Sequence, residues 1–417
     1  MSDDTEESVR AEVRAWLEAN WDTDLGLFEW RGRLADSGWG APMWSKEWYG
    51  RDLPVGLVPV VEEELKRVGA VGVARKGAAI LTGATLQAHG TDMLREKYLR
   101  RSLTGEDTWC QLFSEPGSGS DLAGATTRAE FKGNKWVING QKVWTTSAHL
   151  ADYGLLLART DWDAPKHKGL SFFILDMRQP GVEVVPLRQM NGHASFNQVF
   201  FTDAEISPEF MLEEEGAGWK IATTTLMHER RSADSMRRNV TPTESPKRIY
   251  QEEAREIVEA LAPYTWYPQR SGRVDLILER ARETGKINDP VVRQEIAKLL
   301  ILARSAEWTT QRAKVAQALG RVPGPEGSLG KLANSNVARA ANRVHTMISG
   351  ADAMLSGEDG PMNGVIAEVL ISTPAISIAG GTDEIQKNII SERVLKMPKE
   401  HRIDTDRPFR DVPRNVV

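Results

Sequence analysis

The sequence predicts a multidomain α+β protein in which a β region lies between two helical regions. Three observations support this. Residues 1–108 repeat apolar side chains at helical spacing, residues 109–215 alternate with a period of two, and helical spacing returns over 216–397. The remaining segment, 398–417, is polar and contains proline, which predicts a C-terminal tail on the surface. The chain of 417 residues exceeds one ordinary domain, since domains hold roughly 100–200 residues.

The first region is predicted to be all helical. Val9, Val13, Trp16 and Leu17 form a stripe that repeats every three to four residues, as on one face of a helix. Glycine and proline separate this helix from the next ones. Those further helices are expected over 57–71, 80–87 and 91–101.

The β region is predicted to be an antiparallel barrel or sandwich. Its strands are closely spaced, with turn residues rather than helices between them, which does not suit a parallel sheet. Gly133-Asn134 marks one hairpin turn. The expected strands cover 125–131, 136–138, 153–158, 170–176, 182–187 and 198–202.

The second helical region begins near Gly216. Pro290 follows Asp289, a good first-turn position for a helix. The expected helices cover 219–237, 251–260, 274–283, 290–319, 328–347 and 381–395.

Composition removes several classes of function. Cys110 is the single cysteine, so an internal disulfide and a multi-cysteine metal site are excluded. The 7 histidines include no pair at helical zinc spacing, and no metal is predicted. The formal charge of −5 gives no basic field for nucleic acid. No apolar run reaches the ~18 residues of a membrane span, and the acidic start is unlike a signal peptide, so we expect a cytoplasmic protein without membrane or nucleic-acid partners.

Motifs for hydrolases, P-loop NTPases and dinucleotide-binding Rossmann domains are missing from the chain. Two other segments combine small residues, hydroxyls and an aromatic ring: the loop from Phe113 to Asp121 and Trp144-Thr-Thr-Ser147. Glycines let backbone N–H groups approach a ligand closely, and a tryptophan can flank a flat ring. On the residues alone, a loop of this kind is more often a plain turn than a ligand-binding loop, and the second segment could equally cap a strand.

Together these segments resemble the acyl-CoA dehydrogenase family of flavoenzymes. Asn139 through Ser147 and Gly381-Thr-Asp-Glu-Ile-Gln-Lys-Asn-Ile-Ile390 follow the 113–121 loop in the family's order and spacing. The resemblance implies an N-terminal helical domain, a central antiparallel β domain and a C-terminal four-helix bundle. Segments 109–116, 164–173 and 324–332 look like the actinobacterial branch, some of whose members oxidise steroid side-chain CoA thioesters.

The resemblance implies bound FAD and conversion of an acyl-CoA to a trans-2-enoyl-CoA, a step of β-oxidation in lipid or steroid degradation. Ser120 and Arg230 are the expected substrate contacts. Electrons are expected to pass to an electron-transfer flavoprotein, and the oligomer is expected to be a homotetramer or a heterotetramer with a paralogous subunit. The cofactor contacts that it implies are Phe113, Ser114, Gly119, Ser120, Trp144, Thr145, Thr146, Thr382 and Glu384.

The catalytic base is the main departure from the family pattern. Many members carry a glutamate just before the Gly-Thr of the C-terminal motif, but Gly380 occupies that slot here and can supply only its backbone N–H. A minority of members place the glutamate on the first helix of the C-terminal domain, where Glu229 and Arg230 stand. Ile221, Ala222 and their helical neighbours share the face of Glu229, and an apolar face raises a carboxyl pKa and suits proton abstraction. We therefore predict that Glu229 is the base.

Two further departures concern the cofactor. The arginine motif that usually holds the pyrophosphate is missing, and Arg282-Glu-Thr-Gly285 is its nearest counterpart. The glycine pair near the neighbouring subunit's adenine appears only as Ser349-Gly-Ala-Asp352. Two alternatives follow: a structural subunit of a heteromeric dehydrogenase that lacks its own base, or an oxidase or flavin monooxygenase on the same fold.

Overall fold

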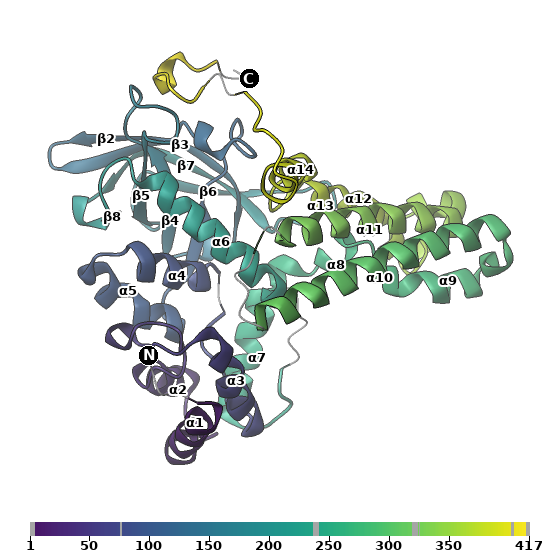
Figure 1. Cartoon of the computed structure of the whole chain (residues 1–417), viewed down its shortest axis with the longest axis horizontal. Coiled ribbons are helices and arrows are strands. Elements are labelled where there is room, and N and C mark those ends of the chain that lie inside the picture. Colours follow the sequence, from purple (N-terminus) through teal and green to yellow (C-terminus); the bar gives the residue numbers. More distant parts are fainter. Residues whose placement is uncertain are drawn as a thin grey trace. The chain divides into compact units, whose positions relative to one another are not determined.

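The computed structural model describes residues 5–75, 77–236, 242–318, 324, 326–401 and 404–413 (Figure 1). By its internal contacts the chain divides into two compact units. The first comprises Met1–Leu187, Ala194–Pro263 and Ile403–Val417. The second comprises Arg188–His193 and Tyr264–Arg402.

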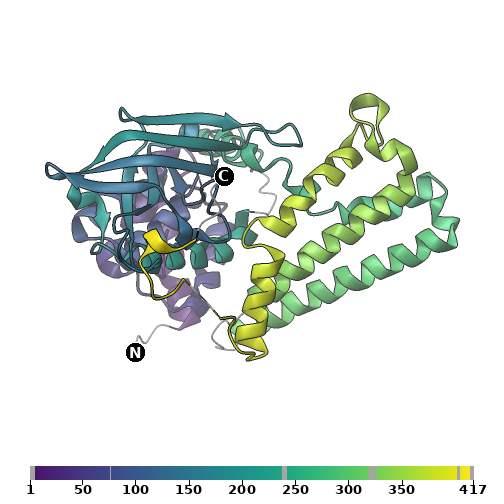
Figure 2. The same ribbon diagram turned by 90° about the horizontal axis from the view of Figure 1, so that it is seen from above.

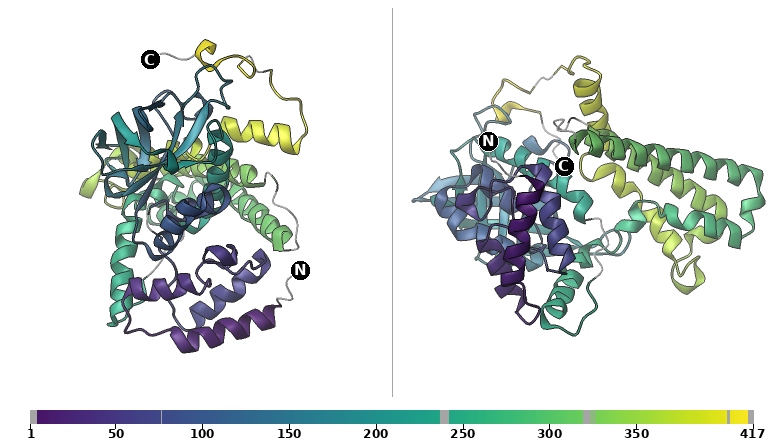
Figure 3. Two further views of the ribbon diagram at one scale, coloured as in Figure 1. Left: turned by 90° about the vertical axis from the view of Figure 1, so that its left-hand side faces the viewer. Right: turned by 60° about the horizontal axis from the view of Figure 1, so that its bottom comes forward.

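The N-terminal part of the first unit is helical, as predicted (Figure 3). Helix α1 begins with a capping box, in which the Thr5 hydroxyl accepts from the Ser8 N–H and the Ser8 hydroxyl accepts from the Thr5 N–H. Val9, Val13 and Leu17 are buried, which confirms the predicted stripe. The helices are α1 (Glu6–Asn20), α2 (Leu27–Asp36), α3 (Val58–Arg67), α4 (Ala79–His89) and α5 (Asp92–Thr104).

The β region forms one eight-stranded sheet in the order β6-β7-β3-β2-β4-β5-β8, with β1 paired to β4. Most pairs are antiparallel, as expected, but β1 and β2 pair with β4 in parallel. The buried strands β4 and β5 carry the core of the sheet. The strands are β1 (Trp109–Leu112), β2 (Arg128–Lys132), β3 (Lys135–Thr146), β4 (Tyr153–Arg159), β5 (Leu170–Asp176), β6 (Val182–Leu187), β7 (Phe196–Ile206) and β8 (Met211–Leu212).

Two later helices also belong to the first unit. Helix α6 (Gly218–Met236) packs on α4 and against β5, and α7 (Arg248–Leu261) packs on α2 (Figure 1). The sequence pattern places these helices after the β region, and their contacts join them to the elements before and within it. As a result, α6 lies beside β4 and β5, and β4 pairs with β1, the strand that leads into the 113–121 loop.

The second unit is helical, and α10 and α11 lie side by side in it (Figures 1 and 2). Its core contains Ile296, Leu299, Ala341 and Val344 from this helix pair. The helices are α8 (Tyr267–Arg270), α9 (Ile277–Glu283), α10 (Pro290–Ala318), α11 (Glu326–Ser349), α12 (Val365–Ser372), α13 (Pro374–Ile378) and α14 (Asp383–Ile389).

One stretch of the second unit, Val365–Val394, is long and apolar enough to cross a membrane by length and composition, with a mean hydropathy of 1.5 over its best window. The structure divides it into α12, α13 and α14 at Pro374 and at the turn of Gly380 and Gly381. A single segment of this kind is weak evidence for a membrane span.

The C-terminal segment departs from the surface-running tail that the sequence predicts. Residues 404–413 pack on the first unit, and Phe409 and Val412 are buried there. The sequence pattern also missed α2, α12 and α13, which the structure shows as helices.

Candidate active site

The loop from Phe113 to Asp121 follows β1 and is held at its first residues. Phe113 is buried and its ring meets Phe172 edge-on, with 5.8 Å between centroids. The Ser114 carbonyl accepts a 2.8 Å hydrogen bond from the backbone N–H of Val143 in β3. The two segments that the sequence singled out are therefore neighbours in the structure.

The middle of this loop is tight, and its tip is open. Glu115 and Ser118 exchange two backbone hydrogen bonds of 3.0 Å, and the Ser118 hydroxyl donates to the Asp121 carbonyl at 2.6 Å. Gly119 and Ser120 are exposed, and none of the described residues lies within 4 Å of a Cβ built on Gly119. A fixed loop with an open tip suits the close approach of a ligand to backbone N–H groups.

A buried ion pair joins the loop to β3. The Lys142 ammonium lies 2.8 Å from Glu115 Oε1 and donates to the Phe113 carbonyl at 2.9 Å. The Glu115 carboxylate also accepts from the backbone N–H groups of Thr126 and Thr127. Burial opposes ionisation of Glu115, but the Lys142 charge and these hydrogen bonds lower its pKa to about 2.

Trp144 stands out of β3 because the strand bulges there. The register with β7 shifts between Lys142 and Thr145, and Trp144 has a left-handed φ of 63°. Its side chain is 56% exposed and meets Phe196 edge-on at 5.7 Å. The bulge thus presents a broad aromatic face beside the 113–121 loop.

The next residue carries an unused polar group. Thr145 is 1% exposed, and its hydroxyl has no hydrogen-bond partner among the described residues. Asn197 on β7 donates to the Thr145 carbonyl at 3.0 Å, and its own Oδ1 likewise has no partner there. Buried polar groups are normally paired, so these two atoms indicate a ligand or bound water.

Helix α6 carries Glu229 beside β1. Gln111 Nε2 donates a 3.2 Å hydrogen bond to Glu229 Oε2, and Glu229 is half-buried. Ile221, Ala222 and Thr225 on the preceding turns are fully buried, as the spacing predicts. The side chain of Arg230, the expected substrate contact, lies outside the described residues.

Two polar contacts fix α6 on α4. The hydroxyls of Thr85 and Thr225 lie 2.8 Å apart in a buried contact. His89 lies between Glu213, at 2.6 Å, and the Thr224 hydroxyl, at 2.8 Å. These contacts set the position along α6 from which Glu229 projects.

The remaining predicted residues lie in the second unit. Gly380 and Gly381 form a turn with left-handed φ angles of 69° and 84°. Thr382 then caps α14, because its hydroxyl accepts from the Ile385 N–H at 3.3 Å. Glu384 is exposed on the first turn of α14, and Arg282 is exposed on α9.

Asp383 anchors this turn to α11. It is buried, and its carboxylate contacts Lys331 at 3.0 Å and Arg339 at 2.7 Å. Burial opposes ionisation of Asp383, but hydrogen bonds from Ser335, Lys331 and Arg339 lower its pKa to about 2. The ion pairs of Asp383 with α11 therefore hold the Gly380–Thr382 turn in place.

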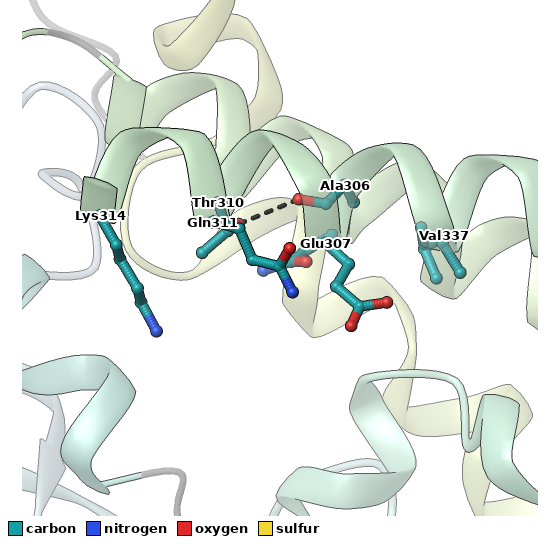
Figure 4. A pocket seen from close by; sticks show the side chains of 8 residues that line it. Ala306, Glu307, Thr310, Gln311, Lys314 and Val337 are labelled. Carbon is teal, nitrogen blue, oxygen red and sulfur yellow. Dashed lines mark hydrogen bonds between the residues drawn. The ribbon is translucent and has the colours of Figure 1, made fainter. Parts of the chain in front are cut away.

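A shallow groove of about 360 Å³ runs between α10 and α11 in the second unit (Figure 4). The Thr310 hydroxyl donates to the Ala306 carbonyl within it. None of the predicted site residues lines this groove, so it is separate from the candidate site. Its lining residues are Ala303, Ala306, Glu307, Thr310, Gln311, Lys314, Asn334 and Val337. Among the residues that the structure describes, no group of three or more His, Cys, Asp or Glu could hold a metal ion.

Comparison with known proteins agrees with this architecture. Three family models match in order: the acyl-CoA dehydrogenase N-terminal domain over residues 2–106, the middle domain over 110–204 and the C-terminal domain over 272–395. The acyl-CoA dehydrogenase IpdE1 of Mycobacterium tuberculosis is 32% identical, covering 94% of this chain and 98% of that protein. The chain belongs to the acyl-CoA dehydrogenase family.

Solved structures of acyl-CoA dehydrogenases share the fold. The Tcur3481-Tcur3483 steroid ACAD is 25% identical with a TM-score of 0.63, over 95% of this chain and 98% of that one. The ChsE4-ChsE5 complex of Mycobacterium tuberculosis has a TM-score of 0.60 at 23% identity, over 96% of this chain and all of that one, 100%. The resemblance to this family of oxidoreductases, and to its helical, β and helical domains, is therefore confirmed.

Within this family frame, the first unit brings together part of the predicted site. Phe113, Ser114 and the Trp144–Thr146 segment meet through the hydrogen bond between Val143 and Ser114, and Glu229 joins them through Gln111. Gly380, Thr382 and Glu384 share one turn of the second unit, whereas Arg282 lies on α9.

The sequence interpretation missed Gln111, Lys142 and Asn197. Their signal was faint because each lies in a strand, where a polar side chain ordinarily faces solvent.

Proposed function

We propose that this chain is a FAD-dependent acyl-CoA dehydrogenase that forms a trans-2-enoyl-CoA, with Glu229 as the base that removes the α-proton. The observation that carries the proposal is the hydrogen bond from Gln111 to Glu229. It places a carboxylate beside strand β1, which ends at Leu112, directly before the predicted flavin loop begins at Phe113. Gly380 offers no side chain for this task.

The residues present fit a flavin. The Thr145 hydroxyl is buried without a partner in the described part of the chain, Trp144 is exposed beside it, and the space around Gly119 is open to the described residues. Phe113, Ser114, Ser120 and Thr146 complete the proposed set in the first unit, and Arg282, Thr382 and Glu384 in the second. Bound FAD supplies the acceptor for the β-hydride at its N5 atom.

The chain itself supplies the proton chemistry. Glu229 takes the α-proton, and Gln111 holds the carboxylate in position by donating to one oxygen. Buried Ile221 and Ala222 keep the same helical face apolar, which disfavours charge on a carboxylate and strengthens it as a base. The backbone N–H of Gly380 remains as a donor for the thioester oxygen, where negative charge develops.

The proposed substrate is bulky, such as a steroid side chain, a branched acyl group or a long chain, in lipid or steroid degradation. No described residue lies within 4 Å of a Cβ built on Gly380, so the slot of the missing glutamate is open on that count. The similar Tcur3481-Tcur3483 protein, a steroid ACAD, supports this class. Ser120 and Arg230 are the proposed substrate contacts.

Electron-transfer flavoprotein is the proposed electron acceptor, and the proposed assembly is a cytoplasmic tetramer. The paired name of the similar steroid ACAD favours a heterotetramer with a paralogue over a homotetramer. The same observation keeps a second function open, a subunit without its own base. Oxidase activity is a third outcome that an oxygen measurement separates.

Anaerobic flavin bleaching tests the proposal. The purified chain, alone and co-expressed with a paralogue, is titrated with straight, branched and steroid acyl-CoAs. We expect a yellow protein whose flavin is bleached by the bulky thioesters. No flavin after purification and FAD addition would refute cofactor binding.

Two further readings separate the alternatives. Peroxide formed at the rate of enoyl-CoA production would assign an oxidase instead. Bleaching of the co-expressed complex that survives replacement of Glu229 by glutamine would assign the base to the paralogue and favour the structural-subunit function.

A further inference from the structure

The C-terminal segment 404–413 is built into the first unit by backbone hydrogen bonds. The Phe409 N–H donates to the Ala164 carbonyl and the Arg410 N–H donates to the Trp162 carbonyl, both at 3.0 Å. Pro408 and Pro165 form an antiparallel bridge. The segment therefore has a fixed register on the connection between β4 and β5, and its yellow ribbon lies against the first unit in Figure 2.

Phe409 covers a buried arginine that supports the 113–121 loop from behind. The Arg159 guanidinium carbon lies 3.4 Å from the centroid of the Phe409 ring, and both residues are fully buried. Arg159 donates to the carbonyls of Ala123, at 2.6 Å, and Ala125, at 3.0 Å, just after Asp121. A ring face over a desolvated guanidinium is attractive, so Phe409 stabilises the geometry in which Arg159 binds these carbonyls.

A second link runs through Lys166. Its ammonium lies 2.6 Å from Asp121 Oδ2 and 2.8 Å from Asp404 Oδ2, and only 8% of its side chain is exposed. One nearly buried charge therefore joins the C-terminal segment to the last residue of the loop. Asp121 in turn accepts from the Ser118 hydroxyl at 2.6 Å, and Gly119 and Ser120 lie between these two residues.

The two ends of the loop depend on different parts of the chain. Lys142 and Val143 of β3 hold the Phe113 end. Lys166 and Arg159 hold the Asp121 end, and both contact the C-terminal segment. Loss of that segment should release one end of the loop and leave the other in place.

We propose that segment 404–413 is a positioning element of the active site, acting through Lys166 and Arg159 to fix the Asp121 end of the loop. The inference rests on the proposed function in assigning Gly119 and Ser120 to the cofactor and thioester. Asp404, Phe409 and Lys166 are thus positioning residues.

Matched aspartate variants test the link in the full-length chain. Asp404→Asn removes one of the two ion pairs of Lys166, the one with the C-terminal segment, whereas Asp163→Asn removes an exposed pair with Arg410 in the same region. Hydrogen exchange followed by mass spectrometry reports the backbone N–H groups of 117–125 without any need for activity. We expect about tenfold faster exchange there in Asp404→Asn, with unchanged exchange at 135–146 and no change in Asp163→Asn.

Functional readouts follow on the same proteins. Lys166→Met should weaken FAD binding and raise KM for the acyl-CoA that bleaches the flavin, each by about tenfold, with a smaller change in kcat. Lys166→Arg should restore part of the FAD affinity and part of the KM. Phe409→Leu, which replaces the ring face over Arg159 with a smaller apolar side chain, should repeat the exchange effect in milder form.

Equal exchange at 117–125 in wild type, Asp404→Asn and Lys166→Met would overturn the proposal. Faster exchange in a chain that binds no FAD at all would support the link and refute the proposed function instead. Faster exchange with unchanged FAD affinity and KM would also overturn it, because the segment would then stabilise the loop without serving the site.

Discussion

Gln111 Nε2 and Glu229 Oε2 are joined by a hydrogen bond of 3.2 Å between strand β1 and helix α6. The two residues stand 118 positions apart in the sequence, so only the fold brings them together. Because β1 runs directly into the 113–121 loop, this contact ties the proposed base to the proposed flavin loop. It also gives the proposed proton transfer a geometric requirement that can be tested.

Glu229→Gln should abolish most turnover while FAD and acyl-CoA still bind. The amide keeps the shape and the contact with Gln111 but cannot accept a proton, so kcat should fall by about 100-fold or more. Single-turnover flavin bleaching measures the loss, and flavin absorbance measures cofactor content.

Glu215→Gln serves as the matched control. Glu215 is exposed just before α6, and its amide variant should keep wild-type turnover. Near-normal bleaching in Glu229→Gln would end the assignment of the base.

Gly380→Glu, placed in the Glu229→Gln background, should restore part of the lost turnover. The slot has open space for the new side chain. Its φ of 69° is left-handed, however, and costs a residue with a Cβ about 1 kcal/mol or more. The recovery should therefore be smaller than the sequence alone suggests, and thermal unfolding should show the strain.

Gly380→Ala is the control for that strain. It should lower stability by a similar amount without restoring any bleaching. If Gly380→Glu also restores none, the side chain at this position does not reach the α-proton.

The order of the helical and β regions could be predicted from the sequence. The helical spacing and the turn residues indicated it, together with the two segments around Ser120 and Trp144. Helix α2 was not predicted, because its N-cap residue, Gly26, makes no side-chain capping hydrogen bond. The burial of Phe409 was not predicted, because a single aromatic residue in a polar tail has no periodicity that marks it as buried.

The buried ion pair that supports the candidate site could not be predicted from the sequence. Lys142 lies in a strand whose alternation is broken by bulges, so its polar side chain turns inward against the pattern. Its partner Glu115 stands 27 positions away. A charged residue is buried only when such a partner is present, and pairing at that separation follows from the sheet register rather than from local sequence.

The buried pair itself leads to a stability prediction. Lys142→Met leaves the Glu115 carboxylate buried without its counter-ion and should cost about 3–5 kcal/mol of unfolding free energy. Adding Glu115→Gln should recover most of this cost, because the second charge is then gone as well. Urea unfolding of both single variants and the double variant measures the coupling, and additive losses would show that the pair is not coupled.

Acid should weaken the wild type more than the double variant. The pKa of Glu115 falls from 4.5 to about 2 in the folded chain, so its stabilisation is complete above pH 4.5 and is lost as pH falls through about 2. The shift corresponds to roughly 3 kcal/mol. Urea unfolding at pH 6, 4 and 3 compares the two proteins, and parallel losses would show that Glu115 is not the source.

Thr145→Val should separate the effect of the buried hydroxyl on stability from its effect on FAD affinity. The Thr145 hydroxyl is buried and has no partner among the residues that the structure describes, so replacing it with a methyl group should leave stability unchanged or raise it by about 1 kcal/mol. If the hydroxyl binds the flavin, the same change should weaken FAD affinity by about tenfold.

Thr82 on α4 provides the control, because its hydroxyl is also buried without a partner among the described residues, yet it belongs to no predicted site. Thr82→Val should match the stability effect and leave FAD affinity unchanged. FAD titration by fluorescence compares the two, and equal affinity in both variants would remove Thr145 from the cofactor site.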